Sequence, residues 1–323
     1  MQICVTGANG FIGRQLIEAL STKGNSIRIL TRQNKTIFPP NIDIIIGDLT
    51  KSDCPLNKFM AGCDVLFHCA GEMRDEKLMH LLHVEGTKRL INSAQNEYSH
   101  YKRKIHWVQL SSCGAYGPPI GKPEISRVVT ENSATHPANI YESTKTISDE
   151  LVIHACDSGK MTFSILRPSN VFGAEMANQS LFKLILMVKR GHFFYIGKAG
   201  SIATYVHVND VVKALMILAV NPRAKGEIYN LSNDCKFEDL INTIASLLNV
   251  CKPKIRIPGP IIRIPIGVLA KLLKRWVHIP RLDALVMRTR YPTKKIESEL
   301  DFLFTMPLPK SVEDLIRRVN QNK

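Results

Sequence analysis

A glycine loop near the N-terminus constrains the fold of this chain more than any other feature. Residues 6–13 read TGANGFIG, so Gly7, Gly10 and Gly13 recur at intervals of three. The loop follows a short β-branched run at residues 3–6 and precedes a segment with apolar residues at helical spacing. Glycine allows a tight turn and a close backbone approach, and the free N–H groups of a helix N-terminus attract phosphate. The loop therefore predicts a strand, a pyrophosphate-binding turn and a helix, as in a dinucleotide-binding fold.

Strand-like and helix-like segments alternate through most of the chain. Apolar runs predict strands at residues 3–6, 26–32, 42–46, 64–69, 105–111, 163–167 and 227–231. Helical periodicity follows the glycine loop and recurs at residues 85–94 and 141–154. Crossovers of this length are typical of parallel sheets with helices on both faces. The sequence therefore predicts an α/β fold built on a doubly wound parallel sheet of the Rossmann type.

The regular alternation of predicted strands and helices ends after residue 167. Shorter patterns predict a strand at 203–208 and helices at 181–189, 209–220 and 237–249. We expect these segments to form a smaller, discontinuous C-terminal domain that binds the substrate. The dinucleotide-binding domain is then expected to comprise 1–170 and 203–233, and the substrate-binding domain 171–202 and 234–323.

Positive charge is concentrated in one late segment. The chain has a formal net charge of +15, but residues 251–295 contain twelve of its basic residues and a single acid, Asp283. The rest of the chain is nearly neutral, which argues against a nucleic-acid-binding protein and favours a local anionic partner. Residues 261–278 show an apolar and a basic stripe at helical spacing. Three roles stay open for this predicted helix. It could present a solvated face of the second domain, cover a substrate diphosphate as a lid, or contact an anionic membrane peripherally.

The cysteines bear on metal binding and on location. None of the eight cysteines lies two to four residues from another, which excludes the usual zinc spacings, and no metal is expected. Scattered single cysteines suit a reducing compartment. No apolar run reaches the roughly 18 residues that span a bilayer, and the chain opens directly into a predicted strand. We therefore expect a cytoplasmic protein.

Two positions bear on the identity of the dinucleotide. The second predicted strand ends in Thr31-Arg32, with no acid to accept from a ribose 2′-hydroxyl. Arg32 could form a bidentate pair with the 2′-phosphate of NADP, so NADP is favoured over NAD, although a solvated strand end is the alternative. Asp48 follows the third strand and could accept from the adenine amino group, or could simply be a turn residue.

A hydroxyl, a phenol and an ammonium are predicted to meet at the edge of the sheet. Tyr141 and Lys145 are spaced i, i+4 on a predicted helix, so they share a face. A tyrosine with its usual pKa near 10 is a poor base, and lowering that pKa by about three units requires about 4 kcal/mol. The Lys145 ammonium and a cationic nicotinamide could supply it. Ser112 follows the strand at 105–111, at the edge where ligands of parallel sheets bind, and could bind a substrate oxygen.

The motifs of the chain, taken in order, resemble those of extended short-chain dehydrogenase/reductases of the NAD-dependent epimerase/dehydratase family. They are TGANGFIG, GDL at 47–49, HCAG at 68–71, LSSCGAYG at 110–117, YESTK at 141–145, RPSNVFG at 167–173 and YVHVNDVVKA at 205–214. The resemblance implies Tyr141 as the acid/base, Lys145 as its activator and a ribose contact, and Ser112 as the catalytic hydroxyl. It also implies that Asn170 lies near the substrate phosphates and that Asp210 is a helix cap.

The resemblance and the glycine loop together give a set of expected cofactor-binding residues. They are Gly7, Asn9, Gly10, Phe11, Ile12, Gly13, Arg32, Asp48, Leu49, Cys69, Ala70, Gly71, Lys145, Pro168 and Val171. One departure is informative, because family 4,6-dehydratases carry Thr-Asp-Glu where this chain has Ser112-Cys113-Gly114. Without that acid pair, dehydration is not expected. Cys113 is expected to be a packed residue in preference to a reactive thiol.

We therefore expect an NAD(P)-dependent nucleotide-sugar epimerase or ketoreductase/dehydrogenase, in which hydride moves to or from a sugar carbon and Tyr141 is the acid/base. The substrate is expected to be a small, phosphate-bearing molecule. Two alternatives stay open. One is an NADP-dependent reductase of a non-sugar carbonyl, as in the hydroxysteroid dehydrogenase and flavonol reductase branches. The other is a non-catalytic dinucleotide-binding module, which typically lacks the Tyr–Lys pair. A homodimer is possible from the sequence, and no nucleic acid is expected.

Overall fold

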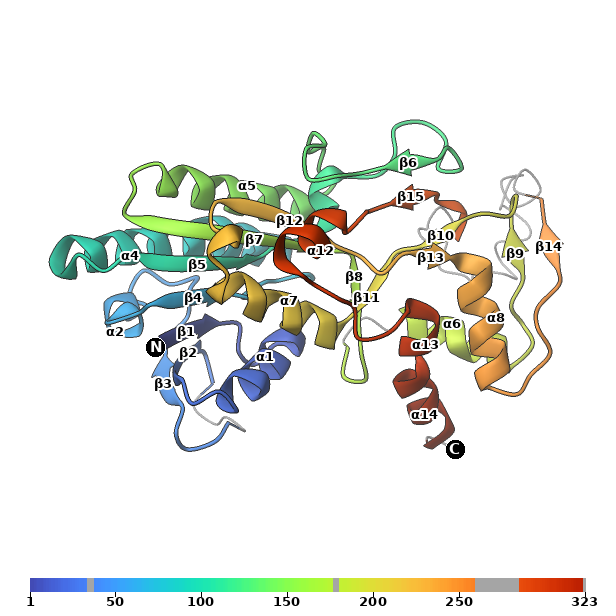
Figure 1. Cartoon of the computed structure of the whole chain (residues 1–323), viewed down its shortest axis with the longest axis horizontal. Coiled ribbons are helices and arrows are strands. Elements are labelled where there is room, and N and C mark those ends of the chain that lie inside the picture. The colour runs from blue at the N-terminus through green and yellow to red at the C-terminus, as the bar shows by residue number, and fades with distance from the viewer. Residues whose placement is uncertain (34–37, 177–179, 259–284, 322–323) are drawn as a thin grey trace.

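The structure, a computed structural model, describes residues 1–33, 38–176, 180–258 and 285–321. Its centre is a seven-stranded sheet in which every pairing is parallel, with the order β12-β7-β5-β4-β1-β2-β3 (Figure 1). The strands are β1 (Gln2–Thr6), β2 (Ser26–Thr31), β3 (Asp43–Ile46), β4 (Val65–His68), β5 (Ile105–Leu110), β7 (Met161–Pro168) and β12 (Glu227–Leu231). The order reverses between β1 and β4, which makes their carboxyl ends a topological switch point.

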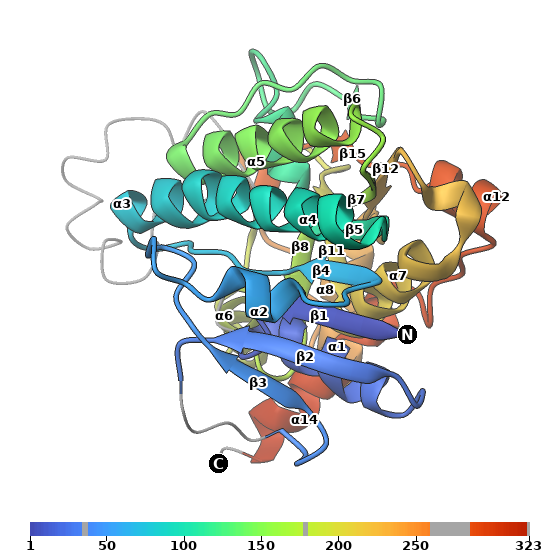
Figure 2. The ribbon, with the colours of Figure 1, turned by 90° about the vertical axis from the view of Figure 1, so that its left-hand side faces the viewer.

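Helices cover both faces of the sheet, as Figures 1 and 2 show. One face packs against α2 (Leu56–Met60), α4 (Thr87–Tyr101) and α5 (Ile140–Cys156). The other face packs against α1 (Phe11–Ser21), α7 (Val208–Val220) and α12 (Lys294–Leu300). The alternation of side chains along β1 explains this, because Ile3 and Val5 belong to the second core and Cys4 belongs to the first. The predicted doubly wound Rossmann sheet is confirmed.

Two local predictions need correction. The helix expected at 85–94 is part of a longer run, which comprises α3 (Glu76–Met79), the π-helical η1 (His80–Gly86) and α4. The cap of α7 is His207, whose side chain accepts from the Asn209 N–H. Asp210 lies buried inside the first turn, where its carboxylate accepts from the backbone N–H of Thr305 at 2.8 Å and from the Thr305 hydroxyl at 2.7 Å. Asp210 therefore anchors a distant segment and is not the cap.

A second, smaller core lies beyond the carboxyl edge of the sheet. It is built on α6 (Ser180–Lys189), α8 (Phe237–Leu247), α13 (Leu308–Ser311) and α14 (Glu313–Gln321). The short strands around it are β8 (Asn170–Phe172), β9 (Tyr195–Ile196), β10 (Ile202–Ala203), β11 (Tyr205–His207), β13 (Cys235–Lys236) and β14 (Arg256–Ile257). We keep the proposed domain division with one amendment. Ile296, Leu300 and Phe302 pack in the core of the large sheet, so α12 goes with the dinucleotide-binding domain.

A long excursion joins β5 to α5 above the site. After η2 (Cys113–Tyr116) the chain forms β6 (Arg127–Val128), which pairs in parallel with β15 (Thr289–Arg290). A short turn, η3 (Pro222–Ala224), leads into β12.

The predicted amphipathic helix at 261–278 lies outside the described residues. In the part of the chain that the structure describes, no helix has the length and apolar character needed to cross a membrane.

Candidate active site

The glycine loop between β1 and α1 is packed too closely for any side chain at two of its glycines. Gly7 has a φ of +71°, and a Cβ there would lie 2.6 Å from the backbone nitrogen of Ala70. A Cβ on Gly13 would lie 2.1 Å from the carbonyl oxygen of Gly7. Gly10 caps α1 and offers no side chain to the first N–H groups of the helix. The loop therefore presents open backbone donors at the positive end of a helix, and it fits the pyrophosphate of a dinucleotide.

A pocket of about 310 Å³ opens beside this loop, at the carboxyl ends of β1, β2 and β4. Nine of the expected cofactor-binding residues line it, namely Gly7, Asn9, Gly10, Arg32, Asp48, Leu49, Cys69, Ala70 and Gly71. The expected cofactor-binding set did not include four polar residues of the same lining, Thr31, Gln33, Thr50 and Glu72. The Asn9 amide donates to the Thr31 hydroxyl at 2.6 Å, which ties the glycine loop to the end of β2. The pocket thus has the place and the residues of a dinucleotide site.

The lining of this pocket contains one cation, Arg32, and two carboxylates, Asp48 and Glu72. Arg32 is exposed, and its guanidinium forms no hydrogen bond or ion pair with any described residue. Burial raises the pKa of Asp48, but bonds from the N–H and hydroxyl of Thr50, and the charges of Arg32 and Lys51, outweigh it and leave that pKa lowered. Asp48 is therefore ionised, and its contact with the adenine amino group stays a prediction; Arg32 is available to an anionic group.

The remaining expected cofactor residues lie outside the lining of this pocket. Phe11 opens α1 and packs against both hydrophobic cores, and Ile12 packs against the core of the large sheet. Pro168 is buried at the end of β7, and Val171 of β8 pairs with Val206 of β11. Of these residues, Phe11 is in contact with both cores, and Ile12 and Val171 pack against the core of the large sheet. Asn170 begins β8, is exposed, and its amide donates to the carbonyl of Thr204 at 3.0 Å.

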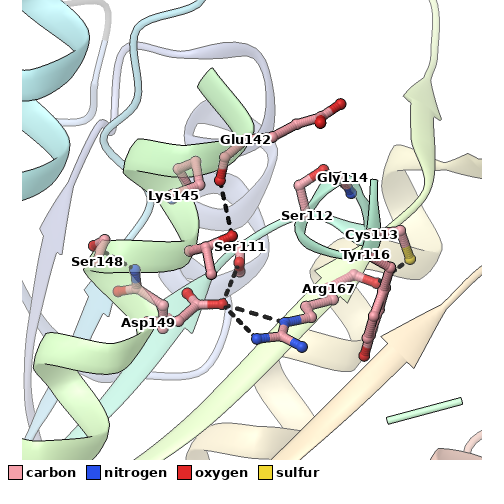
Figure 3. A network of polar contacts seen from close by, with 12 residues as sticks. Ser111, Ser112, Cys113, Gly114, Tyr116, Glu142, Lys145, Ser148, Asp149 and Arg167 are labelled. Atoms are coloured by element: carbon pink, nitrogen blue, oxygen red, sulfur yellow. Dashed lines mark hydrogen bonds and ion pairs between the residues drawn. The ribbon is translucent and has the colours of Figure 1, made fainter. Parts of the chain in front are cut away.

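Ser112, Tyr141 and Lys145 come from two elements that meet at the carboxyl edge of the sheet. The side chain of Asn139 caps α5 by accepting from the Glu142 N–H, so Tyr141 and Lys145 occupy the first two turns. Lys145 is 5% exposed, and its ammonium donates to the carbonyl of Leu110, at the end of β5, at 2.5 Å. Ser112 caps η2, and its half-buried hydroxyl accepts from the Gly114 N–H at 3.0 Å (Figure 3).

The electrostatics of this group differ from the sequence expectation in one respect. Burial, followed by the carboxylates of Asp149 and Glu142, raises the pKa of Tyr141 to about 12. Burial also lowers the pKa of Lys145, against the attraction of Asp149. Desolvation and negative charge therefore act against the lowering of the phenol pKa that was expected from the Lys145 ammonium and a cationic nicotinamide together, which stays a prediction. In this environment Tyr141 is a protonated phenol at neutral pH.

A buried ion pair that sequence reasoning missed supports the catalytic edge. The Asp149 carboxylate accepts from the guanidinium of Arg167 at 3.1 and 3.2 Å and from the hydroxyl of Ser111 at 2.7 Å (Figure 3). Both charged side chains are at least 95% buried. The guanidinium carbon also lies 5.0 Å from the ring centre of Tyr116. The pair therefore fixes α5, β5 and β7 to one another. The available signal was that Asp149 continues the Tyr141–Lys145 spacing by one more turn.

Cys113, which directly follows Ser112, is a buried and packed side chain. It is 3% exposed, its thiol donates to the carbonyl of Arg167 at 3.1 Å, and burial raises its pKa well above the usual value. Cys113 is therefore a packed residue, as the sequence predicts. Among the described residues, no group of histidine, cysteine or acidic side chains is arranged to hold a metal ion.

The fold and its glycine-rich turn define the class of this protein, a dinucleotide-binding enzyme with a Rossmann sheet. Residues 3–232 match the model of the NAD dependent epimerase/dehydratase family, and the chain belongs to that family. It is an enzyme of the extended short-chain dehydrogenase/reductase type, as the motifs predict.

Curated relatives cover about three quarters of the chain. A Stigmatella aurantiaca enzyme, 4-hydroxy-2-methyl-3-oxo-4-farnesyl-3,4-dihydroquinoline-1-oxide ketoreductase, is 28% identical over 244 residues, which are 74% of this chain and 70% of that one. The 3 beta-hydroxysteroid dehydrogenase/Delta 5→4-isomerase of Mycobacterium tuberculosis is 24% identical, over 81% and 73% of the two chains. Sterol-4-alpha-carboxylate 3-dehydrogenase (decarboxylating) of Bos taurus is 25% identical, over 79% and 72%.

Solved structures agree on the fold. MoeE5 in complex with UDP-glucuronic acid and NAD superimposes with a TM-score of 0.73 at 20% identity and covers all of both chains. UDP-glucuronic acid 4-epimerase from Bacillus cereus in complex with NAD gives a TM-score of 0.73 at 18% identity, over 100% of this chain and 99% of that one. At these identities the likeness establishes the Rossmann architecture of the chain.

Proposed function

We propose that the chain is an NAD(P)-dependent oxidoreductase that interconverts a secondary alcohol and its ketone, with Tyr141 as the acid/base. The observation that carries the proposal is the burial of the Lys145 ammonium at the end of β5, on the face of α5 that it shares with Tyr141. A lysine is almost never buried unless its charge is used or paired. This chain retains the complete Ser112, Tyr141 and Lys145 set, which disfavours a non-catalytic dinucleotide-binding module.

The protonation state of Tyr141 suits reduction of a ketone. The bound dinucleotide supplies or accepts the hydride. Tyr141, held as a phenol by its raised pKa, donates its proton to the oxygen of the substrate as that oxygen becomes an alkoxide. The Ser112 hydroxyl donates a hydrogen bond to the same oxygen, and the Lys145 ammonium stabilises the phenolate left behind. In oxidation the phenol must first lose its proton.

The cofactor is proposed to be NADP, on the strength of Arg32. Its exposed guanidinium lies in the lining of the pocket at the end of β2 and has no described partner. An arginine there can form two parallel hydrogen bonds with a 2′-phosphate. NAD is the alternative, and the ionised Asp48 nearby partly offsets the positive charge of Arg32.

The substrate is proposed to be an apolar, non-sugar ketone or alcohol. The curated relatives named above act, by their names, on a farnesylated quinoline oxide or on sterols. Three cations of the basic 251–295 segment are also engaged within the protein. Arg256 pairs with Glu238 at 2.9 Å, Arg288 donates to the carbonyl of Ala199 at 2.7 Å, and Lys295 pairs with Glu227 at 2.6 Å. These three are therefore committed and do not form a free diphosphate-binding cluster.

A nucleotide-sugar epimerase or ketoreductase is the second candidate. Lys252, Lys254 and Arg290 of the same segment are exposed and could meet a phosphate-bearing substrate. Product analysis distinguishes the two, because an epimerase returns the dinucleotide to its starting oxidation state and a reductase consumes it. A cytoplasmic location is proposed from the eight free cysteines, which suit a reducing compartment. The membrane contact through 261–278 and a homodimer stay proposals from the sequence.

The test is a Tyr141→Phe variant assayed with NADPH and NADH on a panel of steroid, farnesylated quinoline oxide and nucleotide-sugar ketones. We expect turnover to fall by about 10² to 10⁴ while NADPH affinity, measured by calorimetry, is unchanged. Full turnover in Tyr141→Phe would refute the acid/base assignment. Tighter binding of NADH than of NADPH by the native enzyme would refute the role given to Arg32.

A further inference from the structure

A buried histidine, His83, lies directly behind Tyr141 and takes no part in the steps above. It is 1% exposed and belongs to η1, the π-helical turn between α3 and α4. Its ring meets the ring of Tyr141 edge to face, with centroids 5.8 Å apart and an interplanar angle of 80°. Single π-helical turns inside helices widen the backbone locally and occur often at functional sites. The turn here brings an imidazole against the face of α5 that carries the proposed acid/base.

Both ring nitrogens of His83 are engaged, and their partners fix the tautomer. The backbone N–H of Glu72 donates to Nε2 at 2.9 Å, so Nε2 carries no hydrogen. Nδ1 therefore carries it, and lies 2.8 Å from the hydroxyl oxygen of Thr144. That hydroxyl in turn donates to the carbonyl of Ile140 at 2.8 Å. The hydrogen bonds run in one direction, from the Glu72 N–H through the imidazole to the first turn of α5.

The environment of His83 keeps the imidazole neutral. Burial, followed by the charge of Lys145, lowers the pKa of His83 to about 3. A proton on Nε2 would also face the Glu72 N–H, which can only donate. His83 is therefore unsuited to moving a proton at working pH, and its contacts are those of a rigid support.

The segment that His83 holds is the cofactor-side loop after β4. Gly71 and Glu72 line the dinucleotide pocket. The Glu72 carboxylate accepts from the backbone N–H groups of Met73, Arg74 and Asp75, so the loop is organised around that one residue. Met73, Arg74 and Asp75 are themselves exposed. The bond from the Glu72 N–H to His83 therefore ties an otherwise exposed loop to the buried interior.

We propose that His83 is a positioning residue that couples the cofactor-side loop to the first turn of α5 and so holds the Tyr141 phenol in place for proton transfer. The inference rests on the proposed function for Tyr141. A misplacement of about 1 Å can cost a factor of about 10² in rate. Loss of His83 should therefore act mainly on kcat, with a smaller effect on dinucleotide affinity through the loop.

The experiment compares two substitutions that differ in hydrogen bonding. His83→Phe keeps a ring against Tyr141 but removes both bonds, whereas the amide of His83→Gln can accept from Glu72 and donate to Thr144. The matched control is His106→Phe. His106 is also buried, at 6% exposure, with bonds to Thr162 and to the carbonyl of Leu218 at the opposite end of β5. The measurements are kcat and KM for the ketone, NADPH affinity by calorimetry, thermal stability, and hydrogen exchange of residues 71–75.

We expect His83→Phe to lower kcat by about 10 to 10² with little change in KM, to weaken NADPH binding by several-fold, and to speed exchange at 71–75. His83→Gln should recover most of kcat. His106→Phe should lose stability but keep its kcat and its exchange at 71–75. Equal kcat values in His83→Phe and His106→Phe, or no recovery in His83→Gln, would overturn the proposal.

A second variant keeps the test decisive if His83→Phe fails to fold. Thr144→Val removes the partner of Nδ1, together with the bonds of that hydroxyl to the carbonyls of Ile140 and Tyr141, and leaves the bond from Glu72 to Nε2 in place. It should lower kcat in the same direction as His83→Phe, and a native kcat there would also refute the coupling. The exchange and affinity readouts do not depend on turnover. If Tyr141→Phe remains fully active while His83→Phe still loosens the loop, the proposed function fails and the structural coupling stands.

Discussion

The site has two sides that are built in different ways. We call the pocket beside the glycine loop its cofactor side, and the group around Tyr141, Lys145 and Asp149 its proposed catalytic side. On the cofactor side, backbone turns without side chains form the pocket beside Gly7 and Gly13, and of the charged residues in its lining Arg32 is exposed and Asp48 and Glu72 are half-buried. On the catalytic side, charged groups are buried and paired, as with Asp149 and Arg167, and Lys145 is 5% exposed. The first side depends on the shape of a contiguous segment. The second depends on side chains that meet from α5, β5 and β7, so the two sides should fail in different ways.

On the cofactor side, a large loss of dinucleotide affinity is expected for Gly13→Ala. A methyl group there would lie 2.1 Å from the Gly7 carbonyl oxygen, and the packed backbone cannot move away without reshaping the turn. We expect NADPH affinity, measured by calorimetry, to fall by at least about 10², because the N–H groups no longer converge on the pyrophosphate.

The matched control is Gly24→Ala in the same strand–helix unit. Gly24 has a φ of +68°, and a Cβ at this position would meet nothing within 4 Å, so this change strains the backbone without filling space. It should lower the free energy of unfolding by about 1 kcal/mol and leave NADPH affinity unchanged. A native affinity in Gly13→Ala would show that the turn does not depend on close packing.

The catalytic side should lose stability when one partner of its buried pair is removed. Asp149→Asn leaves the Arg167 guanidinium without a full counter-charge at a side-chain exposure of 5%. We expect the free energy of unfolding, measured by denaturant titration, to fall by about 3 to 5 kcal/mol.

The control for this prediction is an exposed ion pair of the same type. Arg223 and Asp301 lie 2.9 Å apart with side-chain exposures of 58% and 83%. Asp301→Asn should therefore change the free energy of unfolding by no more than about 1 kcal/mol. Similar losses in Asp149→Asn and Asp301→Asn would remove the distinction between the two sides.

A pH dependence of stability is expected from the buried histidines. Burial lowers the pKa of His68 and His83, and also that of His106 and His207, so the folded chain resists binding protons that the unfolded chain accepts near pH 6.5. Stability is therefore expected to be full above about pH 6.5 and to fall as the pH drops below it, by up to about 1.4 kcal/mol per unit for each histidine.

Thermal or denaturant unfolding between about pH 7 and pH 5 measures this slope. In His83→Gln the slope should be shallower by the share of one histidine. An unchanged slope would mean that His83 has the same pKa in the folded and unfolded chains. It would refute the lowering of the His83 pKa by burial.

Much of the fold was predictable because its signals are local. All seven strands of the large sheet were expected within two residues of their observed ends, since each is a short apolar run between turns. The glycine loop was predictable for the same reason, and nine of the expected cofactor-binding residues line one pocket. The wrong predictions concerned residues whose role depends on contacts with distant parts of the chain. Asp210 has the sequence position of a cap, but its partner is Thr305, 95 residues away.

The sequence by itself determined the doubly wound sheet, the dinucleotide turn and the spacing of Tyr141 and Lys145, because each follows from residues close together in the chain. The tertiary structure decided the protonation of the site. Whether Tyr141 is a phenol or a phenolate depends on its burial and on Asp149 and Glu142, and whether His83 supports it depends on an N–H donated by Glu72. Desolvation and charge act through space, so no local pattern of residues could reveal them.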